Sequence, residues 1–191
     1  MIFETIVTTL YADGRVHIAP MGVREEDGFI IISPFRPSTS LDNLLREQSG
    51  VINYTDDVRV FAGCLTGRWQ WPTLPVESIR GARLAGALAH TEVRLDRVED
   101  DPVRPRLICK PSHHAHHSPF RGYNRAQAAV LEAAILASRL EMLAWGKIDQ
   151  ELAYLKIAID KTAGPRELEA WTWLMEKIEA HRQQATMGSA K

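Results

Sequence analysis

The stretch Ser-Pro-Phe-Arg-Pro-Ser-Thr-Ser-Leu-Asp-Asn, residues 33–43, decides how the rest of the chain is interpreted. It closes an apolar run, residues 29–35, which is typical of a strand buried on both faces, and it precedes leucines at helical spacing. At the start of a helix, free N–H groups, hydroxyl side chains and the Arg36 guanidinium can converge on one anion. The pattern therefore predicts either an anion site or a hydroxyl helix cap beside an exposed arginine.

The residues before this stretch have the composition of β-strands. Residues 2–11 are rich in β-branched side chains, an Asp-Gly turn follows, and we expect 16–24 to form the return strand. With the strand at 29–35 they form an antiparallel meander. Pro20 and Gly22 interrupt the return strand and indicate a bulge at a sheet edge. Such an edge either faces a planar ligand that approaches the backbone closely or is simply an irregular edge strand.

The residues after it mix helix and strand signals before two longer strands. A short helix from Leu41 ends near Gly50, and the prolines of 69–75 predict a loop because proline cannot donate to a strand ladder. The remaining expectations are a strand at 51–55, a helix or strand at 56–65, and strands at 84–98 and 104–117 joined by a turn at 99–102.

The last third of the chain has helical periodicity. Two adjacent apolar stripes run through 124–145 and predict a single helix that needs cover on more than one side. A second helix carries apolar residues from Ile148 to Ile159, and a third begins at Pro165, a residue suited to the first helical position. We expect its inward face to consist of Leu168, Trp171, Leu174, Met175 and Ile178, and we expect 186–191 to fray.

The fold class is mainly β with α: an antiparallel β-barrel or sandwich followed by a C-terminal helical extension. We predict a first domain at 1–121, a helical extension at 122–185 that packs on the barrel and in a dimer interface, and a frayed tail at 186–191.

Composition excludes several classes of protein. The 191 residues carry 23 basic and 24 acidic side chains, so no general attraction to nucleic acid or anionic membranes is expected. Two cysteines without a CxxC pattern exclude a disulfide framework and a zinc ribbon, and no apolar stretch is long enough to cross a bilayer. We therefore expect a cytoplasmic protein. No nucleophile elbow, Walker loop or dinucleotide fingerprint is present, which disfavours hydrolases, kinases and Rossmann dehydrogenases.

Two segments have more than one interpretation. In the histidine cluster 113–117, strand alternation places His114 and His116 on one face, where they are weak candidates for metal binding, with His113 and His117 on the other. The segment itself contains no Cys, Asp or Glu to complete a metal shell, so a polar rim of a ligand pocket or an exposed strand end are the alternatives. The Trp-Gln-Trp-Pro stretch, 69–72, forms either a lid over a ligand or part of a core or interface.

The order of these features resembles the FMN-binding split-barrel superfamily, which includes flavin reductases and pyridoxamine-phosphate-oxidase-like proteins. The resemblance rests on Ala-Pro-Met-Gly-Val at 19–23, the apolar strand, Arg36 to Asn43, and Asn-Tyr-Thr-Asp-Asp at 53–57. Within that superfamily the chain is most similar to the uncharacterised DUF447 family, in which Gly-Tyr-Asn-Arg-Ala, here 122–126, opens a helical extension.

This resemblance implies a homodimeric protein that binds FMN noncovalently, with FMN at the subunit interface. It implies that the phosphate lies at the helix start, the flavin ring lies along the return strand, and two residues of the extension reach the partner's flavin. The corresponding residues are Phe35, Arg36, Ser38, Thr39, Ser40 and Asn43 for the phosphate end; Met21, Gly22, Val23 and Arg24 along the ring; Asn53, Tyr54 and Thr55 beside it; and Asn124 and Arg125 from the extension.

The implied function is a flavin-dependent oxidoreductase whose substrate and electron donor the sequence does not identify. A noncatalytic flavin carrier and a metal-binding protein that uses the histidine cluster are the two alternatives.

Overall fold

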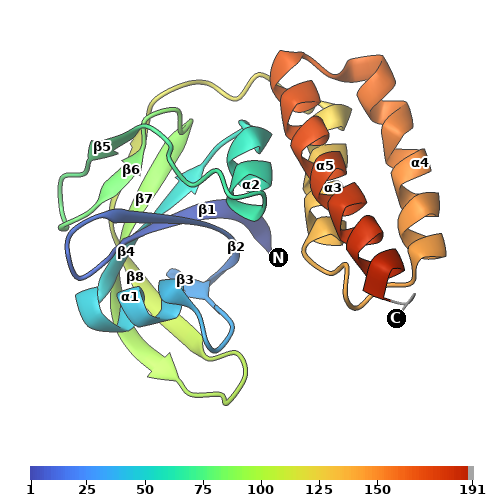
Figure 1. The fold of residues 1–191 in the computed structure, drawn as a ribbon. Coiled ribbons are helices and arrows are strands. Elements are labelled where there is room, and N and C mark those ends of the chain that lie inside the picture. Colours follow the sequence, from blue (N-terminus) through green and yellow to red (C-terminus); the bar gives the residue numbers. More distant parts are fainter. Residues whose placement is uncertain (189–191) are drawn as a thin grey trace. The chain divides into compact units, whose positions relative to one another are not determined.

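The computed structural model describes residues 1–188, and the chain divides into two compact units (Figure 1). The barrel unit comprises 1–56 and 69–120, and the helical unit comprises 57–68 and the C-terminal part from residue 121 onward. The segment 57–68, which the sequence-based boundaries assign to the first domain, thus groups with the C-terminal helices.

Six antiparallel strands close the barrel in the order β1-β2-β3-β8-β7-β4, with β4 pairing back to β1. This confirms the predicted antiparallel barrel with a C-terminal helical extension. The bounds are β1 Phe3–Leu10, β2 Val16–Glu26, β3 Phe29–Ile32, β4 Ser49–Tyr54, β7 Ala89–Glu99 and β8 Arg106–His116. Strand β3 is shorter than predicted and ends at Ile32, yet Ile30, Ile31 and Ile32 are all buried, as expected of a strand covered on both faces.

The predicted bulge in β2 is wrong. The register between β1 and β2 is continuous from Phe3 opposite Val23 to Leu10 opposite Val16. Within β2, strand β3 pairs with residues 23–26, and in the described chain β1 is the strand that pairs with residues 16–22. Pro20 therefore lies where β3 does not continue, and this position tolerates its missing N–H without a bulge. The edge of β2 at residues 16–22, on the side away from β1, faces the site described below.

The barrel interior is filled by aliphatic side chains from every strand and from α1, Thr39–Glu47. Leu41 and Leu44 of α1 are almost fully buried in this core, so the helix is fixed against the barrel. Its other end is closed by Gln48, which adopts a left-handed backbone conformation and donates its N–H to Leu44 O.

A small second sheet corrects the prediction that 69–75 is entirely loop. Strand β5, Thr73–Pro75, pairs with β6, Ala82–Leu84, which the sequence had suggested was the start of a longer strand. In a two-stranded sheet each strand has one edge without a neighbouring strand, so Pro75 can end β5 without the loss of a ladder hydrogen bond.

The helical unit contains α2 Val58–Leu65, α3 Arg125–Ala137, α4 Trp145–Thr162 and α5 Pro165–Gly188, packed around a shared apolar core. The predicted single helix 124–145 is wrong: α3 ends at Ala137, and α4 begins only at Trp145. Leu140 packs into the core from the connecting turn, which explains why the apolar pattern continues where the helix does not. Leu168, predicted to face inward, is half exposed, whereas Leu174 and Ile178 are buried.

The C-terminal helix extends further than predicted. No proline or glycine interrupts it before Gly188, so residues 186–188 of the tail predicted to fray are helical. Residues 189–191 lie outside the described residues. Among helices of the described chain, 1–188, none combines the length and apolar character needed to span a membrane.

Candidate functional site

A cleft of about 700 Å³ opens in the barrel unit, beside residues 16–18 of β2. This volume lies within the range typical of small-molecule sites. Its walls come from the first hairpin, the start of α1 and the segment before β5. The lining residues are Tyr11, Arg15, Val16, His17, Ile18, Thr39, Trp69, Gln70, Trp71 and Thr73.

The start of α1 forms one end of this cleft. Thr39 is the first helical residue, and Ser38 caps the helix by accepting a hydrogen bond from Leu41 N. The first turn of any helix presents N–H groups without intrahelical partners and the positive end of the helix dipole. Arg15 is also among the lining residues, and its guanidinium pairs with the Asp13 carboxylate at 2.8 Å. This end of the cleft is therefore suited to an anionic group.

A row of hydrogen bonds runs along the β2 side of the cleft. His17 Nε2 lies 3.1 Å from Ser40 Oγ, and His17 Nδ1 lies 3.2 Å from Tyr11 Oη. Burial lowers the pKa of His17, so its ring is neutral at pH 7, with one nitrogen able to donate and the other to accept. Sequence reasoning missed His17. Its signal was a polar residue in the apolar return strand, near the edge already marked by Pro20.

The opposite wall carries Trp69 and Trp71 and is positioned by the small sheet. Ala85 N donates to Pro72 O at 2.9 Å, which closes the segment onto the end of β6. Strand β6 is in turn docked on the barrel by Asn53, whose Oδ1 accepts from Leu84 N at 2.7 Å. Asn53, predicted to flank the flavin ring, is fully buried and donates to Ile6 O and Thr8 Oγ1. Its contacts position the cleft wall.

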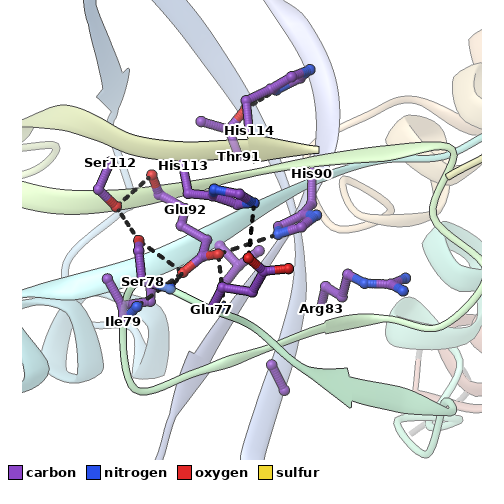
Figure 2. Close-up of polar contacts among 12 residues, drawn as sticks. Glu77, Ser78, Ile79, Arg83, His90, Thr91, Glu92, Ser112, His113 and His114 are labelled. Atoms are coloured by element: carbon purple, nitrogen blue, oxygen red, sulfur yellow. Dashed lines mark hydrogen bonds and ion pairs between the residues drawn. The ribbon is translucent and has the colours of Figure 1, made fainter. Parts of the chain in front are cut away.

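The connection between β5 and β6 is held by the buried carboxylate of Glu92 on β7 (Figure 2). Its Oε2 accepts from Ser78 N, Ser78 Oγ and Ile79 N, and its Oε1 accepts from Glu77 N. Burial opposes ionisation, but these donors outweigh it and hold the pKa of Glu92 below its ordinary value. The ionised side chain thus organises 77–79.

The residues predicted for the phosphate end are not all brought together. Ser38, Thr39 and Ser40 gather at the start of α1. The Arg36 guanidinium instead bonds the Asp100 carboxylate at 2.7 Å and Asp101 O at 3.1 Å, in the turn between β7 and β8. Phe35 precedes it and is 58% exposed. Asn43 is buried, where it donates to Thr9 Oγ1 and accepts from Arg46.

The residues predicted to lie along the flavin ring are not all brought together either. Met21 and Gly22 lie in the part of β2 that β3 does not pair, beyond the residues that line the cleft. An added Cβ at Gly22 would meet Ile2 Cγ2 at 2.8 Å, so the close neighbour of this glycine in the described chain is the N-terminal segment. Val23 points into the barrel core, and Val23 and Arg24 pair with β3.

A second hollow of about 370 Å³ gathers other predicted residues. Tyr54, Thr91 and His114 line it together with residues 25–30 of the turn between β2 and β3 and Pro111. Tyr54 Oη lies 3.2 Å from Thr91 Oγ1, which lies 2.8 Å from His114 Nδ1. His114 Nε2 is 3.2 Å from His116 Nε2, so the predicted same-face pair is adjacent. Thr55 follows the end of β4.

Asn124 and Arg125 belong to the helical unit. Asn124 caps α3 by accepting from Ala126 N at 2.8 Å, and its amide nitrogen donates to Thr162 O. Arg125 is the first residue of α3 and is exposed.

Comparisons with known proteins identify relatives of the chain. The family model described as "Protein of unknown function (DUF447) N-terminal domain" matches residues 3–118, and the model described as "Protein of unknown function (DUF447)" matches residues 124–176. No curated protein matches the sequence significantly.

Solved structures share the fold. The FMN-bound protein MM1853 from Methanosarcina mazei, titled with the same family name, has a TM-score of 0.80 at 20% identity, covering 92% of this chain and 94% of its own. The 2-nitrobenzoate 2-nitroreductase NbaA from Pseudomonas fluorescens has a TM-score of 0.52 at 18% identity, covering 60% of this chain and 64% of its own. Component B of nitrilotriacetate monooxygenase from Bacillus cereus has a TM-score of 0.50 at 19% identity, covering 65% and 75%.

Proposed function

The chain belongs to the DUF447 family of proteins of unknown function, and we propose that it is a flavoprotein that binds FMN noncovalently and acts as an oxidoreductase. The observation that carries this proposal is the cleft of the barrel unit, which combines a helix start with aromatic walls beside residues 16–18 of β2. The FMN-bound structure of MM1853, which shares the fold over nearly the whole chain, supports the choice of cofactor.

The two ends of the cleft fit the two ends of FMN. Thr39, with its neighbours Ser38 and Ser40, would hold the phosphate at the start of α1, and Arg15 would add charge after exchanging its contact with Asp13. The flat ring would lie beside residues 16–18 of β2 toward Met21, against Trp69 and Trp71. Arg36 would join the phosphate only after exchanging its contact with Asp100.

Bound FMN would supply hydride or single-electron chemistry. The chain would orient the flavin and exclude water with the segment that carries Trp69 and Trp71. His17 would donate or accept a proton. Because His17 is neutral and linked to the hydroxyls of Tyr11 and Ser40, it can donate from one ring nitrogen and accept at the other.

A calorimetric titration of tag-free protein with FMN and with riboflavin tests the binding site. We expect FMN to bind more tightly, because only FMN carries the phosphate. Thr39→Val should weaken FMN by roughly 10- to 100-fold, the value of a hydrogen bond to a charged group, and leave riboflavin unchanged. The matched control is Thr172→Val on α5, whose hydroxyl donates to Leu168 O within its own helix. Absence of FMN binding, or equal losses of both ligands in Thr39→Val, would refute this placement.

Anaerobic mixing of the FMN-loaded protein with NADH or NADPH separates an oxidoreductase from a flavin carrier. We expect the flavin absorbance to bleach with one of the two donors and to return in air. A flavin that binds but is reduced by neither donor would favour the carrier alternative or a partner reductase.

A homodimer is the assembly that we propose. Phe35 and Val103 are each 58% exposed and lie next to each other, because Arg36 N donates to Val103 O. Exposed apolar side chains of this kind are typical of surfaces covered by a partner. In this proposal Asn124 and Arg125 approach the flavin of the partner subunit. One chain has a mass of 21.5 kDa, and light scattering should give twice that mass. The mass of a single chain would contradict the proposed homodimer.

A further inference from the structure

Strand alternation divides the histidines of the barrel unit into two sets. Glu92 pairs with His113, and Thr91 pairs with His114. Because side chains two residues apart share a face, His90 and Glu92 of β7 lie on the same face as His113 of β8. The metal site predicted from the sequence was confined to the histidine cluster 113–117. It did not include the His-Thr-Glu triplet on the neighbouring strand, residues 90–92.

Three potential ligand atoms meet on that face (Figure 2). One atom each from His90, Glu92 and His113 lies within 4.8 Å of the others. His90 Nε2 is 3.5 Å from Glu92 Oε1, and the two atoms share no hydrogen bond. The set contains two imidazoles and one carboxylate, the donors that zinc and similar divalent metals accept.

The two imidazole nitrogens lack hydrogen-bond partners. Within residues 1–188, His90 Nε2 and His113 Nε2 are both buried and neither has a hydrogen-bond partner. His90 is only 3% exposed, so water cannot freely solvate its ring. A buried polar atom without a partner costs free energy, and a metal ion between these atoms removes that cost.

The surroundings orient His90 and Glu92 as a metal site requires. His90 Nδ1 lies 2.9 Å from His117 Nε2, which fixes the ring and directs Nε2 toward Glu92. Three donors occupy Glu92 Oε2, whereas within residues 1–188 Glu77 N alone donates to Oε1, so Oε1 retains a lone pair. Figure 2 shows Arg83 beside this cluster, and its guanidinium donates to Leu84 O at 3.0 Å.

We propose that His90 Nε2, His113 Nε2 and Glu92 Oε1 bind a divalent transition metal ion, for which Zn²⁺ is the probe. Glu77, whose Oε2 lies 3.9 Å from His113 Nε2, or a water completes the shell. Ligand atoms of tetrahedral zinc lie roughly 3.3 Å apart, so the cluster must contract. The His113 side chain is 31% exposed and can rotate to do so. The bound ion would link β7, β8 and residues 77–79.

Titration of tag-free, chelator-treated protein with Zn²⁺, and with Co²⁺ read by its visible absorption, tests this site. We expect one ion per chain. His90→Ala and His113→Gln should each weaken Zn²⁺ by at least about 100-fold, and His117→Ala by ~10- to 100-fold, as for outer partners of metal ligands. The matched control is His116→Ala, which removes a histidine from the other face of β8 and should keep wild-type affinity.

Each outcome decides the proposal. If wild type binds no stoichiometric Zn²⁺, if binding survives in His113→Gln, or if His116→Ala loses the ion instead, the site is refuted. His113→Gln replaces a partly exposed side chain, so it carries the test even where His90→Ala fails to fold. FMN titration of the same variants keeps the result separate from the flavin proposal, because none of these histidines lines the cleft.

Discussion

Asn53 offers the sharpest test of how the cleft is built. Its amide donates to Ile6 O and Thr8 Oγ1 and accepts from Leu84 N, all without exposure to solvent. Asn53→Ala leaves Leu84 N buried without its partner and opens a small cavity. These losses sum to about 2–4 kcal/mol of the free energy of unfolding, since one unsatisfied buried donor costs about 1–3 kcal/mol.

Urea unfolding followed by circular dichroism measures this loss. The matched control is Gln183→Ala, an exposed amide on α5 that bonds only Glu179 among the interactions described, and it should change stability by less than about 0.5 kcal/mol. Because Asn53 positions the wall with Trp69 and Trp71, its replacement should weaken FMN and riboflavin together. Unchanged stability with a loss of FMN binding alone would show that Asn53 contacts the phosphate and would refute the positioning role.

Two further predictions concern buried or partly buried ionisable groups. The folded pKa of Glu92 lies below 4.5, so its contribution to stability is present above that value and is lost as the pH falls through the folded pKa. Wild type should therefore lose stability more steeply than Glu92→Gln between about pH 5 and 3, and parallel curves would contradict this. Burial raises the pKa of the Cys64 and Cys109 thiols to about 12, so both should resist thiol reagents at pH 8 until the protein is unfolded, and rapid labelling of native protein would contradict this.

The strand and helix content of the barrel was predictable because its signals are local. The Asp-Gly turn, the apolar run that forms β3 and the hydroxyl cap at Ser38 each act within a few residues, and each is found in the structure. The errors arose where tertiary context overrides local pattern. Leu140 continues the apolar stripe of α3 from a turn, and Pro20 lies on an edge that exists because β3 is short.

The site was less predictable because it depends on pairing between distant strands. The sequence identified Thr39 and its neighbours, but it placed Arg36 beside them, whereas Arg36 bonds Asp100, 64 residues away. It also took Asn53 for a ligand contact when its partners are Ile6, Thr8 and Leu84. The meeting of His90, Glu92 and His113 requires the register of β7 against β8, which no single stretch of sequence contains.

A crystal structure of the protein soaked with FMN tests the central claim most directly. We predict density for the phosphate at Thr39 and the start of α1, and density for the ring between residues 16–18 of β2 and the side chains of Trp69 and Trp71. Density in the hollow formed by Tyr54, Thr91 and His114, with none in the cleft, would contradict the account.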